Sequence, residues 1–224
     1  MSRPYIPELL DAAATRSAEV AQSLDDLRRF NRWLGGTSVL LGLLAGEVRR
    51  ARVESFSFLD VGAGSGDLAM AVAGRHPQAR IVISDLKPFH LPGKGTPAVA
   101  AAAQALPFPD ASFDYVAASL LLHQLPDAEA VAVLAGFRRI ARRAVLINDL
   151  ERHWFPLAFL SFAAPVFFRS PLTRHDAPAS VRQAFRPEEL GALALAAGFH
   201  DFAVRRHWPW FRLSLVARTC MGHA

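Results

Sequence analysis

The sequence contains a single cysteine, Cys220, among its 224 residues. One thiol cannot form a disulfide within the chain, and it cannot supply the set of thiolates that structural zinc sites use. Small secreted domains held together by disulfides are therefore excluded as a class, and so is a thiolate metal centre. We expect the protein to work in the reducing cytoplasm.

A hydrophobic run long enough to span a bilayer is also missing. The longest run, residues 154–168, contains two prolines and lies between His153 and Arg169. As a helix it would be about 22 Å long, against roughly 30 Å of hydrocarbon in a membrane. The opening MSRPYIPELLDAAA has no apolar core of the kind found in secretory signals. We expect no transmembrane span. The run fits a buried helix, a lid over a pocket, or a segment in weak contact with a membrane surface.

Lysine is scarce, with only Lys87 and Lys94 present, so arginine supplies the net charge of +5. A basic balance permits nucleic acid, anionic lipid or an acidic small molecule as a partner. The arginines are dispersed, which favours solvated helix faces over a polyanion site. A separate RNA-binding module and the N-P-P-Y element of amino-group methylating enzymes are both missing from the sequence, so we expect no nucleic-acid partner.

From residue 57 onward, short apolar strands alternate with helices. The predicted strands are 57–61, 80–84, 97–103, 113–119, 144–149, 201–206 and 211–217, and the predicted helices among them are 67–75, 126–142 and 187–197. Residues 24–34 and 39–48 have helical periodicity, with Thr37 as the N-cap of the second segment. The alternation predicts an α/β fold, in which helices cover both faces of a parallel sheet.

The most informative stretch is an apolar strand that runs into three alternating glycines, Gly62, Gly64 and Gly66, and then a helix. Such glycines permit a tight turn and let a ligand approach the backbone. Asp85 ends the next strand, where a carboxylate can accept the hydroxyls of a ribose. Dinucleotide sites have a glycine where this chain has Asp67, and an acid there would repel a pyrophosphate. The pattern favours a phosphate-free nucleoside with an amino-acid end, such as S-adenosyl-L-methionine (SAM), over NAD.

A third motif, ALPFPDASFDYV at residues 105–116, completes a set that resembles the class I SAM-dependent methyltransferases, in the group akin to ubiquinone and menaquinone C-methyltransferases. The resemblance implies a Rossmann-like, doubly wound sheet of seven strands with the last strand antiparallel. It also implies SAM across the carboxyl ends of the first strands, with S-adenosyl-L-homocysteine (SAH) as product. From the sequence pattern itself we expect N-terminal helices and a helical lid insertion. We divide one domain into a helical cap (1–52), a SAM-binding core (53–149), an insertion (150–186) and a C-terminal helix with two strands (187–224).

The resemblance also assigns cofactor-binding roles to individual residues. These are Asp60, Gly62, Ala63, Gly64, Gly66, Asp85, Leu86, Ala103, Gln104, Ala105 and Ser119. The family usually has an acid near Ala102 for the adenine amino group, so Gln104 or backbone groups must replace it here. The prolines and glycines between Asp85 and Pro97 leave no room for the usual crossover helix.

Methyl transfer needs a nucleophile near the sulfonium carbon, exclusion of water and, for some acceptors, a base. The candidates for proton removal are His123 after the fourth strand, Asp149 at the end of the fifth, and His153 and His175 around the insertion. Residues 119–121, Ser-Leu-Leu, lack the carboxylate of metal-dependent catechol-type enzymes, so we expect no metal.

The sequence therefore predicts methyl transfer to a small, apolar, hydroxylated acceptor by a monomer or homodimer. Residues 148–153, 173–176 and 187–190 resemble a subset found with type III polyketide synthases, which implies a phenolic, pyrone or polyketide-like acceptor. O-methylation is the first choice. C-methylation of a quinone- or lipid-like acceptor, or a module that binds SAM or lipid without turnover, are the alternatives.

Overall fold

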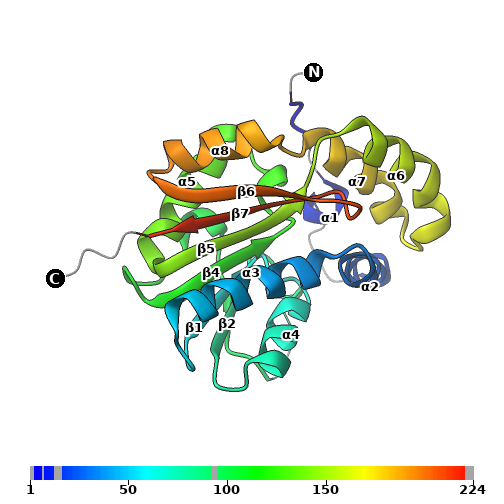
Figure 1. The fold of residues 1–224 in the computed structure, drawn as a ribbon. Coiled ribbons are helices and arrows are strands. Elements are labelled where there is room, and N and C mark those ends of the chain that lie inside the picture. Colours follow the sequence, from blue (N-terminus) through cyan, green and yellow to red (C-terminus); the bar gives the residue numbers. More distant parts are fainter. Residues whose placement is uncertain (1–2, 7, 13–16, 92–94, 220–224) are drawn as a thin grey trace.

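The computed structural model describes residues 3–6, 8–12, 17–91 and 95–219 (Figure 1). Seven strands form one sheet in the order β3-β2-β1-β4-β5-β7-β6. The strands are β1 Ser57–Val61, β2 Arg80–Asp85, β3 Ala98–Ala100, β4 Phe113–Ser119, β5 Ala141–Leu150, β6 Asp201–His207 and β7 Arg212–Arg218. The first five are parallel, and β7 runs antiparallel to both β5 and β6. The predicted α/β sheet with its antiparallel last strand is confirmed.

Helices cover both faces of this sheet, and the helices of residues 9–12, 18–33, 154–167 and 171–183 lie at one end (Figure 1). The helices are α1 Leu9–Ala12, α2 Ala18–Trp33, α3 Gly36–Ala51, α4 Asp67–Arg75, α5 Asp127–Ile140, α6 Trp154–Phe167, α7 Pro171–Gln183 and α8 Pro187–Ala196. On one face α5 and α8 bury Phe137 and Leu190 against alternate strand residues, and on the other α3 and α4 bury Leu44 and Val72. Both faces are apolar because a parallel sheet is buried on each side.

Several predicted boundaries differ from the structure; for example, the helix predicted to end at residue 142 ends at Ile140, and the next strand begins at Ala141. Two of the differences have a clear physical reason. The third strand is limited to residues 98–100, because the alanines that follow favour helix over strand, and residues 103–105 form a 3₁₀ turn. Thr37 is not an N-cap, because α3 already begins at Gly36. Gly35 precedes it with a φ of 72°, and a Cβ there would lie 2.7 Å from Trp210 Cγ, so the turn requires glycine.

An N-terminal strap, residues 3–10 without the undescribed residue 7, crosses the carboxyl end of the sheet. Arg3 donates to the Asp127 carboxylate (Nε to Oδ1, 2.9 Å) and to the carbonyls of His123 (3.1 Å) and Gln183 (2.9 Å). The Asp176 carboxylate accepts the backbone N–H groups of Leu9 and Leu10 at 3.0 and 3.1 Å. The strap is thereby fixed to α5 and α7.

Across the described residues, every helix falls short of the length and apolar character that a bilayer-spanning helix needs. The hydrophobic run predicted as a buried helix, lid or surface segment forms α6, which packs beside α7 at the edge of the molecule (Figure 1). Residues 151–153 connect this pair to the end of β5.

Candidate cofactor and active site

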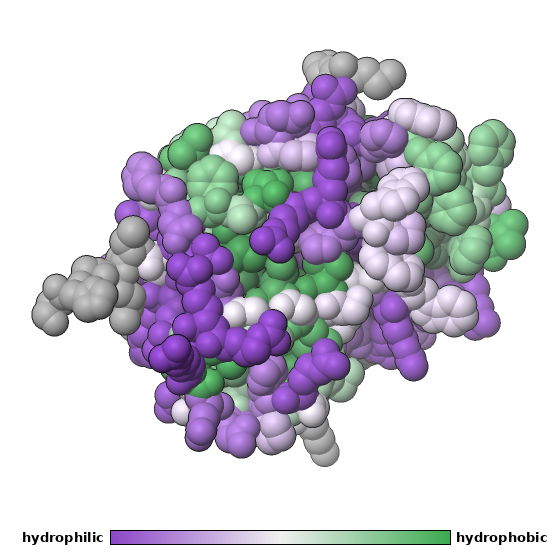
Figure 2. Space-filling view, in the orientation of Figure 1, coloured by the Kyte–Doolittle hydropathy of each residue, from purple (hydrophilic) through white to green (hydrophobic). Residues whose placement is uncertain are grey.

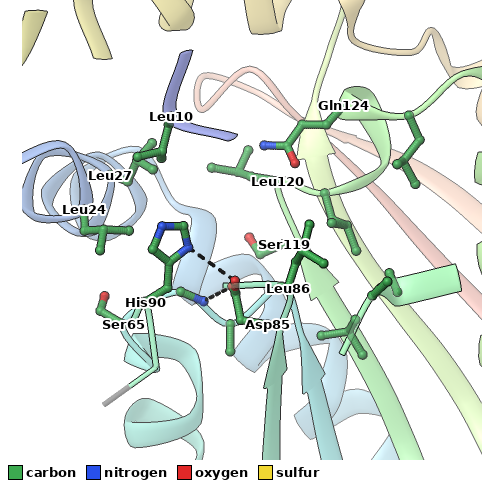
Figure 3. A pocket seen from close by; sticks show the side chains of 18 of the residues that line it. Leu10, Leu24, Leu27, Ser65, Asp85, Leu86, His90, Ser119, Leu120 and Gln124 are labelled. Carbon is green, nitrogen blue, oxygen red and sulfur yellow. Dashed lines mark hydrogen bonds and ion pairs between the residues drawn. The ribbon is translucent and has the colours of Figure 1, made fainter. Parts of the chain in front are cut away.

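A cavity of about 360 Å³ opens at the carboxyl ends of β1, β2 and β4 (Figure 3). The strand order reverses between β1 and β4, which is the position where open parallel sheets bind their ligands. The volume of the cavity lies within the range of roughly 300–1,000 Å³ that is typical of small-molecule sites. The structure therefore forms a pocket where the sequence predicts one.

The glycine turn lines one wall of this cavity with bare backbone. Gly62 and Gly64 have φ angles of 69° and 51°, which lie in the left-handed region that favours glycine. A Cβ on Gly62 would lie 3.3 Å from Leu121 Cδ1, so a side chain at that position would crowd the neighbouring wall. The turn leaves room for a ligand to approach the main chain.

Asp85, at the end of β2, is held in the cavity wall by main-chain hydrogen bonds. Its carboxylate accepts the N–H groups of Gly64 at 2.8 Å and Lys87 at 2.9 Å. Burial alone would raise the pKa of Asp85, but hydrogen bonds from His90 and these two backbone groups lower it below the ordinary value. The site thus contains an ionised, oriented carboxylate that is suited to accept ribose hydroxyls.

A second carboxylate, Asp60, is buried behind the turn. Burial, together with the charges of Asp85 and Asp67, raises the pKa of Asp60 to about 8. Its Oδ2 has no hydrogen-bond partner within the described part of the chain. At neutral pH Asp60 is therefore largely uncharged, and the negative charge at the turn comes from Asp85 and Asp67, which line the cavity. These two carboxylates repel a pyrophosphate and favour a cationic ligand. SAM, with its sulfonium and ammonium groups, fits this site; a dinucleotide does not.

The adenine side of the cavity is formed by residues 101–104 and by α5. Gln104 lines it and donates to the carboxylate of Glu129 at 2.9 Å. Glu129 lies on the same wall and puts an acid on the side where the family pattern would place one near Ala102. The sequence analysis did not identify Glu129, because it lies 25 residues beyond Gln104.

The opposite wall comes largely from the N-terminal helices, which contribute three leucines and, from α2, the polar side chains of Arg28 and Asn31. Leu10, Leu24 and Leu27 face Leu120 across the opening, with Gln124 beside Leu120 (Figure 3). The sequence analysis missed these leucines as site residues, since their helical spacing indicates only a buried face. An acceptor placed there would meet mainly hydrocarbon.

Most of the predicted cofactor residues line the cavity: Gly62, Ala63, Gly64, Asp85, Leu86, Ala103, Gln104 and Ser119. The other three lie next to it. Asp60 is buried in β1, Gly66 is the N-cap of α4 with a φ of 77°, and Ala105 ends the 3₁₀ turn.

His123 and Asp149 form a buried ion pair beside the cavity, and neither is among its lining residues. His123 Nδ1 lies 2.5 Å from Asp149 Oδ1, and Nε2 lies 3.2 Å from Glu8 Oε1 on the strap. Burial would lower the pKa of His123, but the two carboxylates outweigh it and raise the pKa to about 10. At neutral pH this imidazole is therefore protonated and cannot accept a further proton.

His153 and His175 lie on the insertion, away from the cavity lining. His153 caps α6, with its Nδ1 accepting the N–H of Phe155 at 3.2 Å. His175 is exposed on α7, with its Nδ1 3.0 Å from Asp176 Oδ1.

His90 is a lining residue that the sequence analysis did not identify. It is buried, and its Nδ1 lies 3.2 Å from Asp85 Oδ1 (Figure 3). Its Nε2 is without a hydrogen-bond partner among the residues described. The signal available in the sequence is a histidine five residues after the ribose acid, in a loop that is rich in proline and glycine.

Comparisons with known proteins agree with this geometry. Residues 58–144 match the family model described as a methyltransferase domain. No curated protein matches the sequence. Human N-acetylserotonin methyltransferase in complex with SAM is similar in fold, with a TM-score of 0.65 and 18% identity over 96% of this chain and 60% of the human one.

Two further solved structures match over most of both chains. Magnesium protoporphyrin IX methyltransferase from Synechocystis PCC 6803, with bound SAH, gives a TM-score of 0.60 at 15% identity over 87% of this chain and 93% of that one. The plantazolicin methyltransferase BpumL, in complex with SAH, gives a TM-score of 0.67 at 10% identity over 90% of this chain and 89% of that one. Identities this low show a shared fold. Together with the family match over residues 58–144 and the acid-lined glycine cavity, they lead to one conclusion: the sheet and its cavity have the class I fold of SAM-dependent methyltransferases, an enzyme fold whose cofactor is S-adenosyl-L-methionine.

Proposed function

We propose that the protein transfers the methyl group of SAM to a hydroxyl of a small, apolar acceptor of phenolic, pyrone or polyketide-like chemistry. One observation carries the proposal: a single cavity joins the glycine turn and Asp85 to a wall formed by Leu10, Leu24, Leu27 and Leu120. The first part suits the cofactor, and the leucines suit an acceptor with few polar groups.

In this proposal, different residues bind the methionine, ribose and adenine parts of SAM. The main chain at Gly62 and Gly64 receives the methionine end, Asp85 accepts the ribose hydroxyls, and Ala103 and Gln104 border the adenine. SAM, when bound, supplies a methyl group on a positively charged sulfur: a C–O bond forms as the C–S bond breaks, and SAH is the product. The leucines exclude water and hold the acceptor near the sulfur, which is how positioning accelerates such a displacement.

The acceptor hydroxyl must lose a proton, and we infer that His90 takes it. Asp85 lies against its Nδ1, and its Nε2 has no hydrogen-bond partner among the described residues, which leaves that nitrogen available to the acceptor. Within the described chain it is the one histidine that lines the cavity. His153, His175 and Asp149 remain proposals that require the acceptor to extend beyond this cavity.

Calorimetric titration tests the cofactor site. Asp85→Asn keeps the shape of the side chain but removes its charge, and hydrogen bonds to a charged group contribute about 1.5–3 kcal/mol. We expect SAM and SAH to bind at least about tenfold more weakly. Asp110→Asn, at an exposed carboxylate that pairs with Arg139, is the matched control. Equal affinities in the two variants would contradict the assignment of Asp85.

Transfer from methyl-labelled SAM to a panel of phenols and pyrones tests the reaction. Hydroxylated compounds should gain label, and their methyl ethers should not. His90→Gln should lower kcat by about 10²–10⁴-fold, the usual contribution of a positioned general base, and His175→Gln should leave kcat unchanged. An unchanged kcat in His90→Gln would refute its role as the base.

The apolar wall also favours a second candidate, C-methylation of a quinone- or lipid-like acceptor, because such a ring needs no polar anchor. Mass spectrometry of the labelled product separates the two reactions. Label on carbon identifies the second reaction. Absence of label from every acceptor, with SAM affinity intact, would indicate a module that binds the cofactor without turnover.

A further inference from the structure

Helix α6 is hydrophobic on all sides, yet only one side is covered. Its fourteen residues include no charged group. Pro156, Leu160 and Ala164 are buried, the latter two in a cluster with Val181 of α7. The opposite face carries Phe155, Phe159, Phe162 and Val166, and the last two are each 85% exposed. A helix that is apolar all round normally has apolar neighbours on every side, so a contiguous exposed face of this kind marks an interaction surface.

Tryptophans surround this face. The chain contains four tryptophans, and all of them, Trp33, Trp154, Trp208 and Trp210, are 40–72% exposed. Trp154 and Trp208 lie 5.6 and 5.8 Å from the ring of Phe155, and Trp33 lines a cleft with Phe159 and Phe167. Figure 2 shows hydrophobic side chains gathered at the end of the molecule formed by α6. Tryptophan is the residue that proteins concentrate at the boundary between lipid and water.

Positive charge borders the same face. Residues 151–186 contain five arginines and two acids. Arg152 is engaged with Glu189. The other four, Arg169, Arg174, Arg182 and Arg186, are exposed and form no ion pair with any described residue. A groove of about 890 Å³ lies beside α6. Its apolar lining residues include Trp154 and Phe162, and its charged lining residues include Arg182, Arg186 and Glu188. Such a groove combines hydrocarbon contact with cationic donors.

We propose that the α6 face, defined as the exposed residues of α6 with the neighbouring Trp33 and Trp208, binds the surface of an anionic lipid bilayer. At about 21 Å, α6 is too short to cross the hydrocarbon and lies in the interface plane. Phe162 and Val166 enter the acyl region, the tryptophans lie at headgroup level, and the arginines contact lipid phosphates.

A bilayer explains the surface better than a second copy of this chain does. In a two-fold dimer built on this face, each patch would meet itself, and the arginines of one copy would face those of the other. Like charges at such an interface oppose association. An anionic membrane instead offers acyl chains to the exposed apolar side chains of α6 and negative charge to the arginines beside them.

Flotation of the full-length protein with vesicles tests the proposal, which does not depend on the methyl acceptor. Vesicles of phosphatidylcholine with about one-third phosphatidylglycerol should bind the protein, and pure phosphatidylcholine should bind it more weakly. The double variant Phe162→Ser/Val166→Ser should bind at least about tenfold more weakly. Met70→Ser, which removes a 59% exposed side chain from α4, is the matched control.

A second double variant measures how much the arginines contribute to vesicle binding, separately from the hydrophobic residues. Arg169→Gln/Arg182→Gln should bind anionic vesicles more weakly and lose most of the salt dependence of binding. Equal melting temperatures establish that the variants fold. Failure of the wild-type protein to bind either vesicle, or binding unaffected by Phe162→Ser/Val166→Ser, overturns the proposal. So does light scattering that shows a dimer which the same double variant converts to monomer without any vesicle binding, because the face would then join two copies of the chain.

Discussion

The buried pair of His123 and Asp149 predicts that the protein loses stability as the pH rises above neutrality. In the folded state the carboxylates of Asp149 and Glu8 hold the pKa of His123 at about 10, against an ordinary value of 6.5. Between these values the folded protein keeps a proton that the unfolded chain has released. The stabilisation is therefore fully present below pH 6.5 and is lost as the pH rises through about 10.

The size of the effect follows from the single proton involved. One proton of difference changes the free energy of unfolding by about 1.4 kcal/mol per pH unit. Asp60 contributes a slope of the same sign only up to its folded pKa of about 8, because above that value it is ionised in both states. Between about pH 8.5 and 9.5 Asp60 no longer contributes and His123 dominates. Burial lowers the pKa of Arg212 to about 10, and its loss of a proton in the folded state offsets a small part of the His123 slope near the upper end of the range. We expect a net loss of roughly 1 kcal/mol over that range.

Urea unfolding followed by circular dichroism gives the free energy at each pH. His123→Gln should show little slope between about pH 8.5 and 9.5, although it is less stable at every pH, because its two carboxylates lose their buried partner. His76→Gln is the control. Burial lowers the pKa of His76, so that ring is neutral in both states throughout this range. Equal slopes in the wild-type protein and in His123→Gln would refute the assignment of a buried imidazolium.

Three further predictions concern single side chains. Gly35→Ala should lower stability by about 1–3 kcal/mol in thermal unfolding, because its φ is positive and a Cβ would collide with Trp210, whereas Gly42→Ala, with open space in α3, should not. Asp26→Ala should cost about 2–4 kcal/mol, because this buried carboxylate accepts the N–H groups of residues 169 and 170, both at 2.7 Å, and the exposed Asp25→Ala should cost under about 1 kcal/mol. Gly64→Val should abolish SAM binding in calorimetry while Gly74→Val, at an open helix position, retains it.

The parts of the site that could be predicted from sequence are those built locally. The glycine turn and Asp85 follow directly from the ends of two consecutive strands, and the sheet topology brings those ends together. Glu129 and the leucines of the cap escaped prediction because distant elements bring them to the cavity. The state of His123 escaped it for the same reason: its partners lie 26 and 115 residues away, and burial decides whether the ring accepts a proton or holds one.

The strap also constrains the order in which the cavity is completed during synthesis. Residues 3–10 leave the ribosome long before their partners, which lie between His123 and Gln183. All residues that line the cavity precede residue 130, although the strand β4 behind them pairs with the later β5. Leu10 reaches its place in the opposite wall only after α7 has been made. Until then that wall lacks Leu10, and water is less well excluded from the cavity.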